Sequence, residues 1–200
     1  MNTYNDINTP IEITENSTGL DMLNEARRRF SAHFNEEVRK ILSVRAVETK
    51  QAKILSRHLS QRLMAMKTLT ILTQYEINHA TRIVAQFSNG TMDVTPIVFD
   101  SVKKSSYEQY SAEDMKFMWN VLLQELFSQC LKSGASNRNY AEKDRLFSFA
   151  NNAIECWNDM QFMEPEEYEK AQSIIKDFYA ETPNVSTKYS IYAIEEEDEE

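Results

Sequence analysis

Three histidines are the residues of this chain best suited to metal chemistry, and one of them, His79, lies three residues after a glutamate. Glu76 and His79 form a Glu-x-x-His pair, which would place both side chains on one face of a helix. A di-iron helical bundle needs two such pairs and two further carboxylates. The residues three positions before His33 and His58 are apolar, so a second pair is missing. We therefore expect no metal site and no cofactor.

The two cysteines, Cys130 and Cys156, do not belong to a Cys-x-x-Cys pair, so they do not indicate structural zinc. Each lies among apolar residues, and we expect both to be reduced thiols. The chain has only three glycines, which is too few for a phosphate-binding loop or a nucleophile elbow. Nothing in the sequence indicates a catalytic triad. The sequence therefore predicts a protein that is not an enzyme and has no catalytic residues.

Positive charge is concentrated in the stretch between Gly19 and Gly90. Within it Lys and Arg number 12 while Asp and Glu number six, whereas from Thr91 to Glu200 the numbers are ten and 22. A local basic surface can bind phosphate groups or acidic proteins even when the whole chain has a net charge of −9. Seven basic residues are the candidate contacts to a partner or to phosphate: Arg27, Arg28, Arg29, Arg39, Lys40, Lys53 and Arg57.

The same stretch predicts the fold class, because its 70 residues contain no glycine or proline, the strongest helix breakers. We expect a mainly all-α protein, an elongated helical bundle. A long basic helical arm or hairpin would span residues 20–89 within a basic region of residues 19–90. A compact helical body would span residues 111–180 within an acidic region of residues 91–182.

Apolar residues recur at seven-residue spacing along the arm, which is typical of a coiled coil or of a long helix in a bundle. Charged residues interrupt the pattern, so a dimeric coiled coil and a helical bundle with a bend near Thr49 both remain open. Five residues form a candidate oligomer seam: Leu55, Leu59, Met66, Leu69 and Ile83. We expect a homo-oligomer, because symmetric association is a common way to bury such a stripe.

The compact body has clear helix signals. Ser111 and Asp114 have the spacing of an N-terminal capping box. Helices are predicted over residues 112–132 and 140–163, and we expect their tryptophans, Trp119 and Trp157, to be largely buried in the core. Pro165 predicts the first turn of a further helix that runs to about residue 180.

Both ends of the chain have a different composition. Residues 1–18 predict a flexible N-terminal arm, and residues 183–200 predict an extended segment followed by a disordered acidic tail. No apolar run approaches the roughly 20 residues needed to cross a bilayer, and the polar N-terminus has no secretory signal. We expect a cytoplasmic protein that does not bind membranes.

These observations favour a non-enzymatic helical interaction protein, an adaptor, assembly factor or regulator that binds protein partners through its arm. The alternative is a nucleic-acid-associated regulator, in which residues 20–89 contact phosphates and the acidic tail is autoinhibitory. The two functions differ in their response to salt, because phosphate binding weakens steeply as the salt concentration rises.

Overall fold

The computed structural model describes residues 14, 16–89, 97–103 and 105–179 of the chain. Within these residues the chain forms six α-helices and one short 3-10 helix, and it has no β-strand. The elements are α1 (Gly19–Arg45), α2 (Thr49–Thr68), α3 (Gln74–Asn89), η1 (Ser106–Gln109), α4 (Ala112–Ser136), α5 (Tyr140–Asp159) and α6 (Pro165–Tyr179). The prediction of an all-α fold is confirmed.

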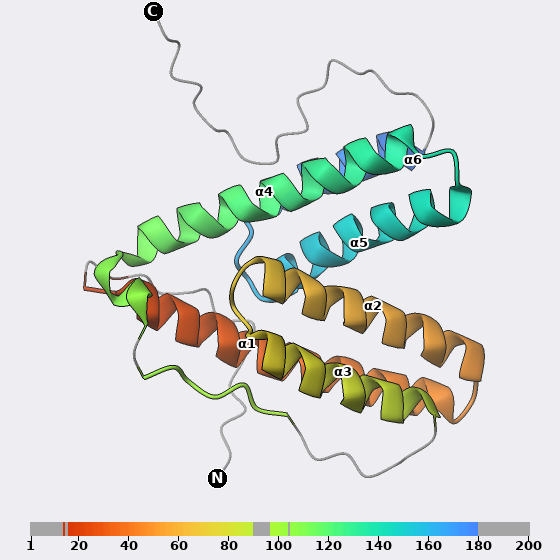
Figure 1. Ribbon diagram of the computed structural model, residues 1–200, viewed down its shortest axis with the longest axis horizontal. Helices are drawn as coiled ribbons and strands as arrows, with labels where there is room; N and C mark the ends of the chain where they lie inside the picture. Colours follow the sequence, from red (N-terminus) through yellow and green to blue (C-terminus); the bar gives the residue numbers. More distant parts are fainter. Residues whose placement is uncertain (1–13, 15, 90–96, 104, 180–200) are drawn as a thin grey trace, which may run out of the picture.

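The helices form one bundle in which α1 is the most enclosed. It packs against α2, α3 and α4, and it has buried residues on most of its faces. Figure 1 shows α4, α5, α2 and α3 following one another from top to bottom, with α1 partly behind α3. The stretch predicted as an arm, residues 20–89, is folded into three helices. Two of these pack on the body, α1 against α4 and α2 against α5.

Two capping boxes start the helices that carry most of the core. The Thr18 hydroxyl accepts from the Asp21 N–H at 3.2 Å, and the Asp21 carboxylate accepts from the Thr18 N–H at 2.9 Å. Ser111 and Asp114 make the same exchange at 3.0 and 3.1 Å, as predicted. The two caps are neighbours, because Thr18 and Ser111 form an isolated antiparallel bridge. The first turns of α1 and α4 are thereby fixed to each other.

Two breaks divide the predicted arm into three helices. The bend predicted near Thr49 is present, because α2 begins at that residue. A second break, between α2 and α3, has no glycine or proline. There Thr70 adopts a φ of 59°, and the side chain of Thr73 accepts from the Glu76 N–H at 3.3 Å to cap α3.

The body also departs from its predicted boundaries. Helix α4 continues to Ser136, so Gly134 lies inside the helix and does not end it. A Cβ atom at this position would come within 2.5 Å of the Phe147 ring. Helix α5 ends at Asp159, four residues earlier than predicted, and Gln161 has a φ of 62° in the turn that follows. Helix α6 begins at Pro165 as predicted.

An aromatic cluster occupies the core of the body. Trp119 and Trp157 are both 0% exposed, as predicted, and meet edge to face with ring centroids 5.6 Å apart. Phe162 stacks on Trp157 at 4.4 Å and meets Trp119 edge to face at 5.7 Å. Such ring pairs stabilise a fold beyond the burial of their area. The cluster joins α4, α5 and the turn between α5 and α6.

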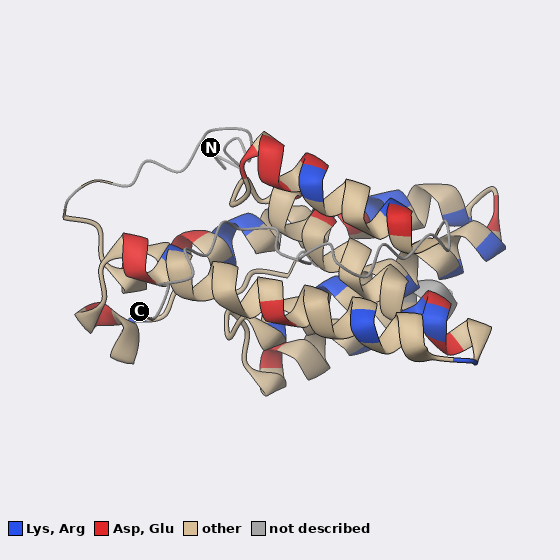
Figure 2. Cartoon of the chain, turned by 90° about the horizontal axis from the view of Figure 1, so that it is seen from above, with Lys and Arg blue, Asp and Glu red and all other residues tan. Residues whose placement is uncertain are grey.

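Acidic and basic residues are interleaved along the helices in the view of Figure 2. In the part of the chain that the structure describes, no helix is long and apolar enough to span a membrane. The predicted N-terminal arm lies mostly, and the segment of residues 183–200 wholly, outside the described residues.

Candidate functional site

The first of the seven candidate basic residues, Arg27, is inside the fold. It is 4% exposed, and its guanidinium donates to the carbonyl oxygens of Ile71 at 2.7 Å and Asp100 at 2.8 Å. It also forms an ion pair with Glu76. A buried charge needs such partners because its desolvation is costly. Arg27 therefore joins α1 to the α2–α3 turn and does not present its charge to a partner, which corrects the expectation from the sequence.

Arg29 is also internal, at 1% exposure. It donates to the Glu25 carboxylate at 2.6 Å and to the Met160 carbonyl at 3.0 Å, so it fixes α1 to the turn after α5. The other five candidates are exposed: Arg28, Arg39, Lys40, Lys53 and Arg57. Of these five exposed cations, three lie on α1 and two on α2. Arg27 and Arg29 have a structural role instead.

The candidate oligomer seam is interior. Leu59, Met66 and Leu69 are each 0% exposed, and Leu55 and Ile83 are partly buried against the same core. The chain's own helices cover this stripe, because α2 packs between α1, α3 and α5. The expectation that the seam lies uncovered on the surface is corrected by this packing.

An ionic network centred on the buried Arg62 guanidinium lies between α1, α2 and α5. Arg62, which is 8% exposed, donates to Glu155 at 2.9 Å and to Asp159 at 3.2 Å, and Glu37 lies 3.9 Å away. Its Nη1 atom is 2.7 Å from Nε2 of His33. Burial, reinforced by the positive charge of Arg62, lowers the pKa of His33 to about 3. His33 is therefore neutral and accepts this hydrogen bond.

The Glu-x-x-His pair does not form a metal site. Glu76 is engaged by Arg27 and by Thr73, whereas His79 is exposed. His58, on α2, is half-buried, and burial lowers its pKa. Within the described residues, no group of three or more His, Cys, Asp or Glu residues is placed to hold a metal ion.

The cysteines are free and buried. Burial raises the pKa of Cys130 to about 11 and that of Cys156 to about 12. A thiol is nucleophilic only as the thiolate. Neither cysteine is therefore suited to nucleophilic chemistry in this fold.

Residues 97–102 lie along α1 without forming a strand, in the connector drawn in green in Figure 1. Asn35 accepts from the Ile97 N–H at 3.0 Å and donates to the Ile97 carbonyl at 2.7 Å. Asn24 pairs in the same way with Val102, at 2.7 and 3.1 Å. These side-chain amides replace the hydrogen bonds that a neighbouring strand would provide.

The middle of this segment is held by Ser31, whose hydroxyl accepts from the Phe99 N–H at 2.9 Å. The Phe99 ring enters the core and contacts Phe30 and Phe34, with centroids 5.6 and 6.0 Å apart. The segment is therefore attached to α1 through side chains of that helix and through one buried ring.

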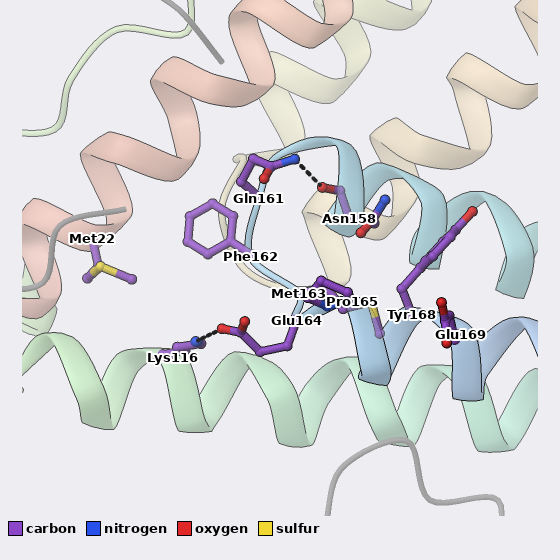
Figure 3. A pocket seen from close by; sticks show the side chains of 10 residues that line it. All are labelled: Met22, Lys116, Asn158, Gln161, Phe162, Met163, Glu164, Pro165, Tyr168 and Glu169. Atoms are coloured by element: carbon purple, nitrogen blue, oxygen red, sulfur yellow. Dashed lines mark hydrogen bonds and ion pairs between the residues drawn. The ribbon is translucent and has the colours of Figure 1, made fainter. Parts of the chain in front are cut away.

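A pocket of about 400 Å³ opens at the turn between α5 and α6, and we call it the α5–α6 pocket. Figure 3 shows its lining, contributed by α1, α4, α5, the turn and α6. Its apolar side chains are Met22, Phe162, Met163 and Pro165, and its polar ones are Lys116, Asn158, Gln161, Glu164, Tyr168 and Glu169.

The turn that shapes this pocket is fixed by one backbone hydrogen bond and one side-chain cap. The Phe162 N–H donates to the Trp157 carbonyl at 3.2 Å, which folds the chain back after α5. The Glu167 carboxylate then accepts from the Glu164 N–H at 2.9 Å and caps the start of α6. The pocket therefore has a defined wall, and Phe162 of its lining is held by the aromatic cluster.

The charges around the pocket are mainly negative. Lys116 and Glu164 form an ion pair across its rim at 3.5 Å. The pKa of Tyr168 is raised by burial, and the negative charges of Glu155 and Asp159 contribute to that shift. Carboxylates thus act on the pocket both from its lining and from the Arg62 network beside it.

This arrangement is suited to binding. Among the described residues that line the pocket there is no cysteine, histidine or serine, so the usual nucleophile–base pair is missing. A hydrophobic floor beside a few convergent polar groups is typical of a recognition site.

The sequence did not indicate this pocket, because its lining comes from positions as distant as Met22, Lys116 and Tyr168. The one local signal was Pro165 followed by acidic residues, which predicted the start of α6 and nothing about the space beside it. Comparison of the chain with protein-family models, with curated proteins and with solved structures finds no match in any of the three.

Proposed function

We propose that this protein is a non-enzymatic helical interaction protein, an adaptor, assembly factor or regulator, that binds a protein partner at the α5–α6 pocket. The observation that carries the proposal is the pocket itself, with its apolar floor, its charged rim and a lining without a nucleophile–base pair. Side chains anchored in such pockets contribute a large share of the free energy of protein association.

The structure supports the pocket more than the basic stretch as the binding site. Arg27 and Arg29 are used inside the fold, and the apolar stripe around Leu59 is covered. By contrast, Gln161 and Glu169 lie exposed at the pocket rim, where a partner can reach them.

A photo-crosslinking experiment tests this function. The amino acid benzoylphenylalanine replaces Gln161 at the pocket in one variant and Glu125 on α4 in a control variant, since both positions are exposed. After irradiation in the native host, we expect a discrete adduct with a second polypeptide from position 161 and none from position 125. No adduct, or the same adducts from both positions, would contradict the proposal.

A regulator that binds nucleic acid through residues 20–89 is the second candidate. The observation that favours it is the exposure of Arg39, Lys53 and Arg57. If it is correct, the logarithm of the DNA or RNA affinity falls linearly with the logarithm of the salt concentration. Replacing these three residues with Gln should then make the slope shallower, and an unchanged slope would remove the candidate.

A further inference from the structure

We propose that the α5–α6 pocket receives a lysine or arginine side chain of the protein partner, flanked in that partner by apolar residues. The inference rests on the proposed function and names the chemistry of the partner. It follows from the floor of the pocket, from the distribution of carboxylates around it and from a lysine of this chain that already occupies its rim.

The floor fits the aliphatic stem of a long basic side chain. Met22, Phe162 and Met163 are 3%, 2% and 7% exposed, so their contribution to the lining is deep and apolar. Lysine and arginine bury their methylene groups along such surfaces while the charged end stays near polar groups. A purely polar ligand would not use this part of the pocket.

The rim fits a positive charge. Glu164 and Glu169 belong to the lining. The charges of Glu155 and Asp159, whose side chains are 33% and 43% exposed, act on Tyr168 of the lining. Lys116 pairs with Glu164, and Arg62 pairs with Glu155 and Asp159, so two cations face four carboxylates. The local charge therefore remains negative and complements a cation.

Tyr168 adds an aromatic face to this side of the pocket. Figure 3 shows its ring close to Glu169, with the Lys116–Glu164 pair on a different side. A cation over an aromatic ring and beside a carboxylate gains from both interactions. The pocket thus combines the two features that favour lysine or arginine over a neutral side chain.

Lys116 of this chain already pairs with one of the rim carboxylates. Its ammonium group lies 3.5 Å from the Glu164 carboxylate, and its side chain is 33% exposed. A partner cation entering the pocket would compete with Lys116 for Glu164. Removing the Lys116 charge should therefore strengthen binding of a basic peptide, whereas removing a rim carboxylate should weaken it.

NMR of the full chain with ¹³C-labelled methionine methyl groups tests the inference. Of the nine methionines, Met22 and Met163 line the pocket, while Met64 lies exposed on α2 as an internal control. The probes are acetyl-Leu-Lys-Leu-amide and its isostere with norleucine in place of lysine. We expect the lysine peptide to shift the Met22 and Met163 signals with an affinity about tenfold higher than the norleucine peptide, and to leave Met64 unchanged. Equal affinities, or no shift with either peptide, would overturn the inference.

Matched variants give the direction of the effect. Glu169→Gln should weaken binding of the lysine peptide about threefold, because partly exposed charge pairs contribute modestly. Lys116→Met should strengthen it by a similar factor. Glu125→Gln, with the same loss of charge on an exposed part of α4, should have no effect. If Glu169→Gln and Glu125→Gln behave alike, or if Lys116→Met weakens binding, the inference fails.

The two proposals fail in distinguishable ways. A partner adduct that forms at position 161 but is insensitive to Glu169→Gln and Lys116→Met would contradict the insertion of a lysine or arginine side chain. The proposed interaction function would still hold in that case. The absence of any adduct at position 161 would instead overturn the interaction function.

Discussion

Nε2 of His33 lies 2.7 Å from Nη1 of Arg62 in the interior of the bundle, and a neutral imidazole is the acceptor of that hydrogen bond. The contact joins α1 to α2, and the carboxylates of Glu155 and Asp159 extend it to α5. Three helices are thus held together by one guanidinium. Such a network stabilises the fold only while every member keeps the protonation state that the others require.

Acid should weaken this fold through His33. Its pKa is about 3 in the folded chain and 6.5 when unperturbed, so the unfolded state takes up a proton first. Its contribution is therefore fully present above pH 6.5 and is lost as the pH falls from 6.5 towards 3, with a slope of up to about 1.4 kcal/mol per pH unit. Urea unfolding at a series of pH values measures this slope.

The control for that series is a pair of histidine variants. His33→Gln keeps a hydrogen-bond acceptor and removes the titration, so its stability should depend less on pH between 6.5 and 3. His79→Gln changes an exposed histidine and should retain the wild-type slope. Asp159, whose pKa is raised by burial, acts in the opposite direction in all three proteins. Parallel curves for wild type and His33→Gln would refute the assignment.

Features that depend on a few consecutive residues were predictable. The capping box at Ser111, the start of α6 at Pro165 and the burial of Trp119 and Trp157 all follow from local spacing and helical periodicity, and the structure has each of them. These signals act within a helix turn or one helix face, so no knowledge of the tertiary fold is needed.

The break between α2 and α3 was not predictable from helix breakers. Its residues are apolar or threonine, and its geometry depends on Thr70 at a φ of 59° and on the ion pair that Glu76 forms with Arg27. That partner lies 49 residues away. A contact of this separation has no local signature in the sequence.

The basic residues show the same limit. The number of positive charges in residues 20–89 can be counted in the sequence, but the enclosed face of α1 cannot be identified there. The burial of Arg27 and Arg29 and the exposure of Arg28 were therefore not predictable. Which arginines are buried depends on how α4 and the connector pack over α1. The α5–α6 pocket could not be predicted from the sequence for the same reason, because its lining depends on tertiary packing.

Asn35 should be more important for stability than its polar side chain suggests. Asn35→Ala removes both hydrogen bonds to Ile97 and leaves a buried N–H and carbonyl unpaired. We expect a loss of about 1–3 kcal/mol per unsatisfied group, measured as a lower urea midpoint. Asn78→Ala removes an exposed hydrogen bond to Gln74 and should change the midpoint little. Equal effects of the two variants would contradict the role of Asn35.

Gly134 should tolerate no side chain despite its place inside a helix. In Gly134→Ala the new Cβ would lie 2.5 Å from Cε1 of the Phe147 ring, so the ring must move. Overpacking of this kind costs about 1–3 kcal/mol, which exceeds the gain of about 1 kcal/mol in helix propensity. The melting temperature should therefore fall. Phe147→Leu in the same chain should recover part of the loss, and a stabilised Gly134→Ala protein would show that the ring yields without cost.

The stripe at Leu59 and Met66 provides the last test, because the sequence and the structure predict different outcomes for it. Both side chains are 0% exposed inside the bundle, so Leu59→Glu with Met66→Glu would place two charges in the core. We expect this double variant to lose helical circular dichroism. A surface seam between copies would instead give a folded monomer.

Leu59→Ala measures how much the buried side chain at this position contributes to stability. We expect the free energy of unfolding to fall by about 2–5 kcal/mol. Sedimentation of the wild type at several concentrations then measures self-association separately. If the Glu double variant remains helical and only its sedimentation changes, the stripe is an interface between copies and the internal packing of α2 is refuted.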